Sequence, residues 1–388
     1  MALTKIVATV GPSIERGDIL TSLFEKGVSV FRFNLKYNTP EWHAILIKKI
    51  RKISQKNKKP VAILLDLPPF KKENSLRKKT EFLKKYLRVL PREEIDFFAV
   101  SFARGRKDVE FFKEKIKGFS LKTKVFAKIE AKESIQNFEE ILDSAIGIMV
   151  ARGDLGKEIP LEKVPYYQKR IIRRCVEVGK PVIVATQMLK SMVENPLPTR
   201  AEVSDVANSV LDYTDAVMLS EETAVGNYPL QAVSMMEKIC SFWEKIRPPI
   251  SWEVEIKRQT SAVVFSAYQM WRAPFCQKEK IEAFLVLTQK GLSAHMLSRL
   301  RPTIPILALT PDEELRNRLS LLFGVIPLVF EKGSNNYYKK RNLKDIKKIL
   351  TFVKRKFHFK RGDKVILVYA EDWQKEGRAN VIRIQEIP

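Results

Sequence analysis

The sequence predicts an α/β protein with a (β/α)8 TIM barrel followed by a smaller α/β domain. Short apolar runs rich in Val and Ile alternate with longer helical runs as far as Ile246, and eight strand-like runs occur there. Each of the eight is apolar throughout, which is typical of parallel strands buried on both faces. Beyond Ile246 two prolines interrupt the pattern, and a shorter alternation of strands and helices follows.

The expected barrel covers residues 1–246. Its strands are expected at residues 4–11, 28–35, 60–67, 95–102, 123–130, 145–152, 181–187 and 214–220, each followed by a helical segment. An open, doubly wound sheet is the alternative arrangement for such a series. A sheet of that kind ends in edge strands, whereas uniformly apolar strands favour a closed barrel.

The expected second domain covers residues 247–388. Its helices are expected near residues 259–271, 291–300, 312–322 and 343–356. Its strands are expected at residues 281–288, 304–310, 325–330, 364–370 and 379–387. The alternation of the two kinds of element predicts another α/β layer.

The chain is strongly basic, with 70 Lys and Arg against 45 Asp and Glu, a net charge of +25. Such an excess attracts nucleic acid, acidic lipid or anionic metabolites. The bases gather in Lys48–Lys59, Lys71–Arg88 and Lys339–Lys364, and the last two runs read as amphipathic helices with a solvated basic face. No zinc-finger spacing or RNP-type aromatic run accompanies them, so nucleic acid is not an expected partner.

The sequence also favours a cytoplasmic protein. No apolar run reaches ~18 residues, so no membrane partner is expected. The first residues lack the charged and small-residue features of a signal peptide. The three cysteines are far apart and odd in number, which fits free thiols in a reducing compartment.

Polar side chains stand at the C-terminal ends of the predicted strands, the face where barrel enzymes place their chemistry. They are Asn34, Asp66, Ser101, Lys128, Glu130, Arg152, Thr186 and Ser220. Lys128 and Glu130 are two apart on one strand and share a face. Glu130 and Asp154 follow neighbouring strands and form a pair of carboxylates suited to a divalent cation such as Mg²⁺. A plain salt-bridge cluster at the mouth of the barrel is the alternative.

Several segments together resemble the pyruvate kinase family, in the order that the family has them. They are TKIVATVGPS, FRFNLKY, AVSFARGRKDV, KIEAKESI, MVARGDLG, VIVATQMLKSM, PTRAEVSDVANSVLDYTDAVMLSEETAVGNYP and FLVLTQKGLSAHMLSRLRP. The resemblance covers about residues 4–70 and 90–388. It implies transfer of a phosphoryl group from phosphoenolpyruvate to ADP, giving pyruvate and ATP, with Mg²⁺ or Mn²⁺. It also implies a homo-oligomer, a tetramer in the family.

The resemblance carries residue roles as well. It implies that Arg32 and Lys128 stabilise the transferred phosphoryl group and that Glu130 and Asp154 bind the divalent metal. Thr186 would lie near the point where the enolate is protonated, so the implied catalytic residues are Arg32, Lys128 and Thr186. The resemblance also implies that the substrate carboxylate is held by residues near the ends of two strands. They are Ala151, Arg152, Gly153 and Asp154, whose backbone would contact it, and Thr186.

The chain departs from the family after the third strand. Where the family has LDTKGPEIR and then a lid (B) domain, this chain has LDLPPFKKENSLRKK, and a short replacement at about residues 68–92 leads to the next strand. A lid excludes water and completes a phosphoryl-transfer site. Its loss motivates two alternatives: a metal-dependent lyase that forms an enolate, such as an oxaloacetate decarboxylase, or a non-catalytic regulator that binds metabolites.

Further departures concern ions and effectors. The family binds a monovalent cation at NFSH, and the resemblance assigns that site to Asn34 and Asp66, but this chain reads NLKY. We expect the Lys36 ammonium to replace the ion, so that K⁺ is not required; a solvated lysine is the other interpretation. Glu221 replaces a glycine at the nucleotide end of the site. A phosphorylated effector would bind the loop that contains Thr288, Gln289, Lys290, Gly291 and Ser293.

Overall fold

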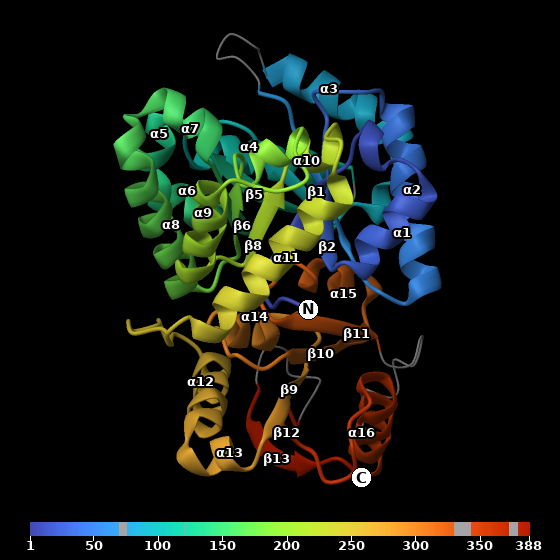
Figure 1. Ribbon diagram of the computed structural model, residues 1–388, viewed down its shortest axis with the longest axis vertical. Helices are drawn as coiled ribbons and strands as arrows, with labels where there is room; N and C mark the ends of the chain where they lie inside the picture. Colours follow the sequence, from blue (N-terminus) through green and yellow to red (C-terminus); the bar gives the residue numbers. More distant parts are fainter. Residues whose placement is uncertain (70–75, 120, 330–342, 372–378) are drawn as a thin grey trace. The chain divides into compact units, whose positions relative to one another are not determined.

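The computed structural model describes residues 1–69, 76–119, 121–329, 343–371 and 379–388. The chain divides into two compact units, Met1–Pro248 and Pro249–Pro388 (Figure 1). This division lies close to the boundary expected after Ile246.

The first unit is a closed barrel of eight parallel strands that follow one another in sequence order. They are β1 (Lys5–Thr9), β2 (Val28–Asn34), β3 (Ala62–Asp66), β4 (Phe97–Val100), β5 (Lys124–Ile129), β6 (Gly147–Ala151), β7 (Val182–Ala185) and β8 (Ala216–Leu219). Pairing of β1 with β8 closes the barrel. The predicted fold class is confirmed, and every expected barrel strand is present.

Helices surround the barrel strands in the first unit (Figure 1). They are α1 (Gly17–Glu25), α2 (Pro40–Asn57), α3 (Leu76–Val89), α4 (Arg106–Gly118), α5 (Lys132–Gln136), α6 (Phe138–Ser144), α7 (Arg152–Glu158), α8 (Val164–Val178), α9 (Arg200–Leu211), α10 (Glu221–Ala224) and α11 (Pro229–Ile246). Four 3-10 turns complete the set: η1 (Pro12–Ile14), η2 (Arg92–Glu94), η3 (Leu161–Lys163) and η4 (Lys190–Val193). Because each strand is followed by one or more helices, the loops that leave the strands gather at one end of the barrel.

Helix α3 lies where the sequence departs from the family. It is strongly basic on one face, and it buries Leu83, Tyr86 and Leu87 on the other. The Tyr86 hydroxyl donates a hydrogen bond to the Leu35 carbonyl oxygen, 3.0 Å away, and so ties α3 to the loop after β2. Between β3 and β4, the described residues contain α3 and η2 and no further helix or strand.

The second unit is built on a five-stranded sheet in the order β11-β10-β9-β12-β13. The strands are β9 (Ile281–Leu287), β10 (Ile306–Thr310), β11 (Val325–Val329), β12 (Lys364–Tyr369) and β13 (Val381–Glu386), and β13 alone among them runs antiparallel to its neighbour. The helices are α12 (Gln259–Arg272), α13 (Pro274–Lys278), α14 (Leu292–Ser298), α15 (Glu313–Leu319) and α16 (Leu343–Phe357). Each predicted element is present, and α13 is additional.

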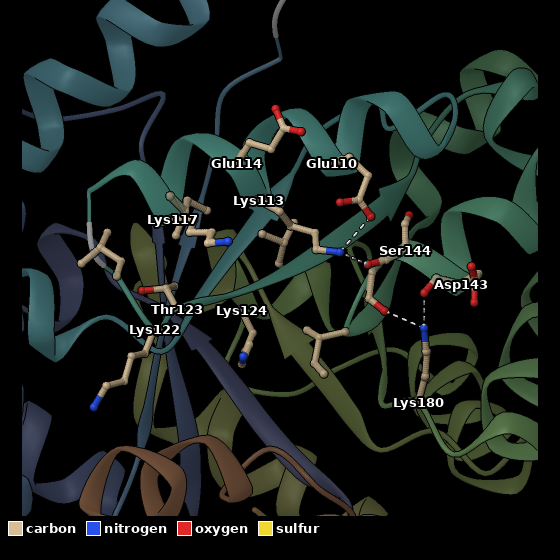
Figure 2. Close-up of a pocket in the computed structure, with 15 residues that line it drawn as sticks. Glu110, Lys113, Glu114, Lys117, Lys122, Thr123, Lys124, Asp143, Ser144 and Lys180 are labelled. Carbon is tan, nitrogen blue, oxygen red and sulfur yellow. Dashed lines mark hydrogen bonds and ion pairs between the residues drawn. The ribbon is translucent and has the colours of Figure 1, made fainter.

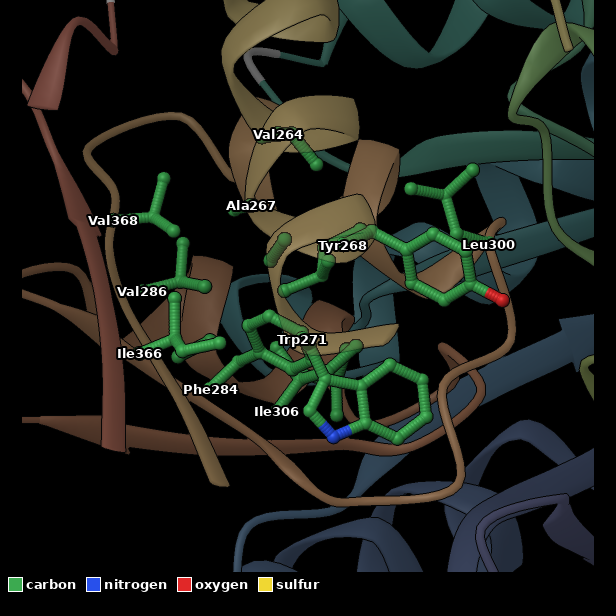
Figure 3. Packing of buried hydrophobic residues seen from close by; sticks show 14 of the residues in the cluster. Val264, Ala267, Tyr268, Trp271, Phe284, Val286, Leu300, Ile306, Ile366 and Val368 are labelled. Carbon is green, nitrogen blue, oxygen red and sulfur yellow. The ribbon is translucent and has the colours of Figure 1, made fainter. Parts of the chain in front are cut away.

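Apolar side chains cover both faces of this sheet. On one face Trp271 and Tyr268 of α12 pack with Phe284 of β9, Ile306 and Ile366 (Figure 3). On the other face, a second cluster of sheet residues packs against four side chains of α16: Ile346, Ile349, Leu350 and Val353. This basic helix is therefore amphipathic, as predicted, and its apolar side is buried.

All three cysteines are free thiols and buried. Cys175 and Cys240 lie in the first unit and Cys276 in the second. Burial raises the pKa of the Cys240 thiol well above its ordinary value. Among the described residues, every helix is too short or too polar to cross a membrane.

Candidate active site

Arg32 and Asp66 form a buried ion pair at the C-terminal ends of β2 and β3. The Arg32 Nε and Nη2 atoms lie 2.8 and 2.6 Å from Asp66 Oδ2. Arg32 Nη1 donates to the Thr9 hydroxyl, 2.9 Å away, on neighbouring β1. The two charged residues are 7% and 1% exposed, so the guanidinium is held in a fixed direction by three strands.

Lys128 extends this cluster to β4 and β5. Its ammonium lies 3.1 Å from Asp66 Oδ1 and 2.8 Å from Glu130 Oε1. It also donates to the Ser101 hydroxyl, 3.0 Å away. An ammonium has three N–H donors, and here it has three oxygen partners. One lysine is thus shared by two buried carboxylates.

The electrostatics differ between these two carboxylates. Burial would raise the pKa of Asp66, but the charges of Lys128 and Arg32 outweigh it and hold that pKa below its ordinary value. Burial raises the pKa of Glu130, with a further contribution from Asp66, and Lys128 only partly opposes it. For Lys128, burial would lower the pKa, but Asp66 and Glu130 outweigh it and raise it. Lys128 therefore carries its charge at neutral pH.

Glu130 and Asp154, the expected metal ligands, lie in different surroundings. Glu130 is 1% exposed, and its Oε2 accepts a hydrogen bond from the Phe102 backbone N–H at 2.7 Å. Asp154 is in the first turn of α7 and partly exposed, and its Oδ1 lies 2.9 Å from the Lys157 ammonium. Carboxylate oxygens are the donors that Mg²⁺ prefers, and one or two suffice when substrate supplies others. The described residues contain no group of three or more Asp, Glu, His or Cys side chains able to hold a metal.

The structure brings Gly153 and Thr186 together. The Gly153 N–H donates to the Thr186 hydroxyl at 2.8 Å. Thr186 has a φ of 70° and Gln187 a φ of 55°, a left-handed backbone that is costly for residues other than glycine. The Arg152 side chain holds this turn, because its Nη2 donates to the Thr186 carbonyl oxygen at 2.7 Å and its Nη1 pairs with Asp205 at 2.6 Å. The Arg152 guanidinium is thereby occupied by contacts within the protein.

The surroundings of Lys36 differ from the expectation. Lys36 is exposed, and its ammonium lies 5.4 Å from the centre of the Tyr37 ring. No carboxylate of a described residue lies within ion-pair distance of it. The Asn34 side-chain oxygen accepts the Lys36 backbone N–H at 3.2 Å, and the Asp66 charge is already met by Arg32 and Lys128. This geometry supports the solvated interpretation of Lys36 rather than a stand-in for the monovalent cation.

Glu221 has an unexpected partner. Its carboxylate forms an ion pair with the Lys190 ammonium of η4. The negative charge that the sequence places at this end of the site is therefore balanced locally. Sequence reasoning also did not single out Thr9 or Phe102, whose contacts with Arg32 and Glu130 depend on backbone geometry and strand order that no motif reveals.

The expected effector loop precedes α14. Thr288 and Ser293 are buried, and the Thr288 hydroxyl accepts the Gly291 backbone N–H at 2.9 Å. Gly291 has a φ of 82°, and a Cβ there would lie 3.1 Å from side-chain atoms of Leu315 and Leu319, so glycine is required. Gln289 and Lys290 complete the loop. Its binding of a phosphorylated effector stays a prediction.

A cavity of about 620 Å³ opens at the other end of the barrel, at the start of β5 (Figure 2). Lysines line it, but two of them serve the end of α6. Lys180 donates to the carbonyl oxygens of Asp143 and Ala145, both 2.8 Å away, and to that of Leu142. Lys113 donates to the Ser144 carbonyl oxygen at 3.2 Å. Unpaired helix-end carbonyls are thereby satisfied, a structural use of these lysines.

Comparison with known proteins agrees with this geometry. A family model described as pyruvate kinase, barrel domain, matches residues 1–80 and 71–233, and one described as pyruvate kinase, alpha/beta domain, matches residues 272–385. A pyruvate kinase of Thermotoga maritima is 32% identical, with all of both chains covered. That of Thermococcus litoralis is 31% identical over 99% of this chain and 98% of its own. That of Sporosarcina psychrophila is 32% identical over 86% of this chain and 73% of its own.

The same comparisons locate the shortening of the chain. The alignment with the Thermotoga protein spans 479 positions, so at least 91 of them (479 less the 388 residues here) are gaps in this chain. The match to the barrel model breaks into two pieces that meet at residues 71–80, at the start of α3. Together with the closed barrel and the second α/β unit, these matches show that the chain belongs to the pyruvate kinase family, as a shortened member without the lid.

Proposed function

We propose that this protein is a working pyruvate kinase, which transfers the phosphoryl group of phosphoenolpyruvate to ADP. The observation that carries the proposal is the placing of two fixed cations, Arg32 and Lys128, side by side on Asp66 at the C-terminal end of the barrel strands. Phosphoryl transfer depends on positioning and on cations far more than on a covalent residue. Family membership over the whole chain supports the same reaction.

Arg32 keeps donors for a substrate. A guanidinium has five N–H donors. Nε and one N–H of Nη2 go to Asp66, and one N–H of Nη1 goes to Thr9. Two N–H groups remain for phosphoryl oxygens. Because Asp66 fixes the plane of the guanidinium, these donors point in set directions, which lowers the cost of ordering them on binding.

A divalent cation, Mg²⁺ or Mn²⁺, would be held by Glu130 and Asp154. When bound it supplies positive charge to the phosphoryl and enolate oxygens. The two carboxylates now pair with Lys128 and Lys157. Either ammonium can give up its carboxylate to the metal. Lys128 would keep its contacts with Asp66 and Ser101, and Lys157 is exposed, so its ammonium would be solvated.

The substrate carboxylate would lie against the start of α7 and the Thr186 turn. The first turn of α7 carries backbone N–H groups that have no partner within the helix, and that of Gly153 already donates to the Thr186 hydroxyl. A Cβ on Gly153 would lie 3.4 Å from the Thr186 hydroxyl oxygen, so a side chain there would be in contact with that hydroxyl. Thr186 is the residue we expect closest to the protonation of the enolate.

The shortened region bears on the nucleotide rather than on the phosphoryl donor. With no lid between β3 and β4, ADP would be held at a more open site, and we expect a high KM for ADP. The two alternatives suggested by the sequence, an oxaloacetate decarboxylase and a non-catalytic regulator, are not favoured by the comparisons, whose matches cover both units and carry the name pyruvate kinase.

The deciding experiment incubates the purified protein with phosphoenolpyruvate, ADP and Mg²⁺ and measures ATP and pyruvate together. We expect equal amounts of both, and neither when ADP or the metal is left out. Folded protein that forms no ATP at millimolar ADP would contradict the proposal. Decarboxylation of oxaloacetate without ADP, in the same preparation, would favour the lyase.

A further inference from the structure

The turn that follows β4 reaches both charged residues of β5. Ser101 comes directly after the strand, and its hydroxyl oxygen accepts a hydrogen bond from the Lys128 ammonium at 3.0 Å. The next residue, Phe102, donates its backbone N–H to Glu130 Oε2 at 2.7 Å. One dipeptide therefore contacts the side chain expected to stabilise the phosphoryl group and a side chain expected to bind the metal.

The Ser101 hydroxyl can serve Lys128 only as an acceptor. Its single proton is donated to the Leu67 carbonyl oxygen at 2.6 Å, in the segment after β3. The lone pairs of the oxygen remain for the ammonium. Of the three oxygens around Lys128, this one alone is neutral, since the others belong to Asp66 and Glu130. Its hold on the ammonium does not change when charged ligands compete for the two carboxylates.

Phe102 is strained in the position where it contacts Glu130. Its φ of 50° lies in the left-handed region, which is unfavourable for a residue with a Cβ. Strain of this kind persists where the surrounding structure enforces it and is common at functional sites. Here the unusual backbone turns the Phe102 N–H toward the buried carboxylate.

We infer that the Ser101–Phe102 turn is a positioning element for phosphoryl transfer, in which Ser101 aims the Lys128 ammonium and the Phe102 N–H aims the Glu130 carboxylate. The inference rests on the proposed function. Ser101 anchors Lys128 to the backbone after β3, and Phe102 anchors Glu130 to the end of β4, so both groups on β5 are fixed from neighbouring strand ends. Neither residue of the turn is assigned contact with the substrate.

The kinetic test compares Ser101→Ala and Ser101→Cys with wild type. Both variants lose the hydroxyl that orients the Lys128 ammonium, and this loss is expected to lower kcat about tenfold to hundredfold. The KM for phosphoenolpyruvate should change less than about twofold, because Arg32 and the backbone of residues 151–154 are untouched. Ser101→Thr keeps the hydroxyl and should restore most of kcat. Ser22→Ala, which removes a similar serine-to-carbonyl bond on exposed α1, is the matched control.

Unchanged kcat in folded Ser101→Ala and Ser101→Cys, with active wild type, would overturn the inference and leave the proposed function intact. A matching fall of kcat in Ser22→Ala, or no rescue by threonine, would show a general loss of structure and would also overturn it. Inactivity of every protein, wild type included, would count against the proposed function instead.

A second measurement does not depend on turnover. Trace acylation of lysines, followed by mass spectrometry of the peptide that contains Lys128, reports how tightly its ammonium is held. We expect Lys128 to react severalfold faster in Ser101→Ala than in wild type, while Lys180, bound to three carbonyl oxygens elsewhere, reacts equally in both. Equal rates for Lys128 would overturn the inference even in an inactive protein.

Discussion

Lys128 serves two buried carboxylates and a hydroxyl at once, so its removal has more than one consequence. Asp66 would keep Arg32 as a partner, but among the described residues Glu130 would keep only the Phe102 N–H. A buried carboxylate that loses its cation binds a proton more readily. The site thus links the charge of Lys128 to the ionisation of Glu130, the expected metal ligand.

Lys128→Met should lower the rate of phosphoryl transfer by about 10²–10³, because it removes a fixed charge from the transition state. Unlike a change on the surface, it should also destabilise the fold by about 3 kcal/mol or more, since it breaks a buried ion pair. Steady-state rates and urea unfolding measured on the same preparation check both effects. A rate within about threefold of wild type would remove Lys128 from the mechanism.

Asp154→Asn and Glu130→Gln should both weaken activation by Mg²⁺. Each keeps its shape but loses a charged oxygen ligand. Asp154 is partly exposed and pairs with exposed Lys157, so its substitution should change the free energy of unfolding by less than about 0.5 kcal/mol. Rates across a magnesium series give the activation constants. Superimposable curves for wild type and both variants would make these carboxylates structural.

The pH dependence of Glu130→Gln follows from the raised pKa of Glu130. A carboxyl whose pKa is higher in the folded than in the unfolded state stabilises the fold below the unfolded value, and this stabilisation is lost as pH rises through the folded value. Glutamine does not titrate. The stability of the variant relative to wild type should therefore improve from pH 4.5 upward. Urea unfolding of both proteins between acid and neutral pH measures this difference.

Lys36→Ser should change activity by less than about twofold, with or without K⁺, because the Lys36 ammonium is exposed beside Tyr37 and surface charges contribute little. Independence from K⁺ stays our expectation, now because Arg32 and Lys128 already neutralise Asp66. Rates across a KCl series, at ionic strength held constant with a bulky organic cation, test both statements. Restoration of a weakened variant by K⁺ would return Lys36 to the cation site.

Among the elements, the helix after β7 has the most specific start. Thr199 accepts the Glu202 backbone N–H, and the Glu202 side chain accepts the Thr199 backbone N–H, a complete capping box at α9. The same helix carries Asp205, which holds Arg152 against the Thr186 turn. The cap therefore supports both a helix and the strained turn beside the site.

Thr199→Ala should destabilise the protein by about 1 kcal/mol through loss of this cap. Thermal unfolding measures the loss, and Thr351→Ala on the exposed face of α16, where the hydroxyl bonds the Lys347 carbonyl oxygen of the preceding turn, is the control. A Tm equal to that of wild type would show that the cap contributes nothing measurable. A small fall in kcat would accompany the loss if α9 steadies the Thr186 turn.

The strands were predictable because burial on both faces leaves a continuous apolar run, and the polar ends of those runs gave Asp66, Lys128 and Glu130, whereas Arg32 came from the family resemblance. Other features leave no such trace. Lys36 lies beyond the end of β2, where side chains no longer alternate, so its direction could not be inferred. The positive φ of Phe102 depends on the turn after β4, and α13 is a five-residue helix with too few residues for a period.

For the whole molecule, the net charge of +25 predicts salt-sensitive binding of anionic substrates. Raising an organic salt from about 0.05 to about 0.3 M shortens the screening length about 2.5-fold, which is enough to weaken long-range attraction. We expect the KM for phosphoenolpyruvate and ADP to rise severalfold and kcat to change little. A constant KM across the series would show that the excess charge lies too far from the site to act on substrates.

The three buried cysteines provide the protein with internal reporters. A thiol must reach solvent before it can react with an alkylating reagent, so each cysteine records how often its surroundings open. Cys175 and Cys240 record openings of the barrel, and Cys276 records those of the second unit. Alkylation of the native protein, resolved by peptide mass, would thus separate the opening free energies of the two units in one intact chain, without added probes or truncation.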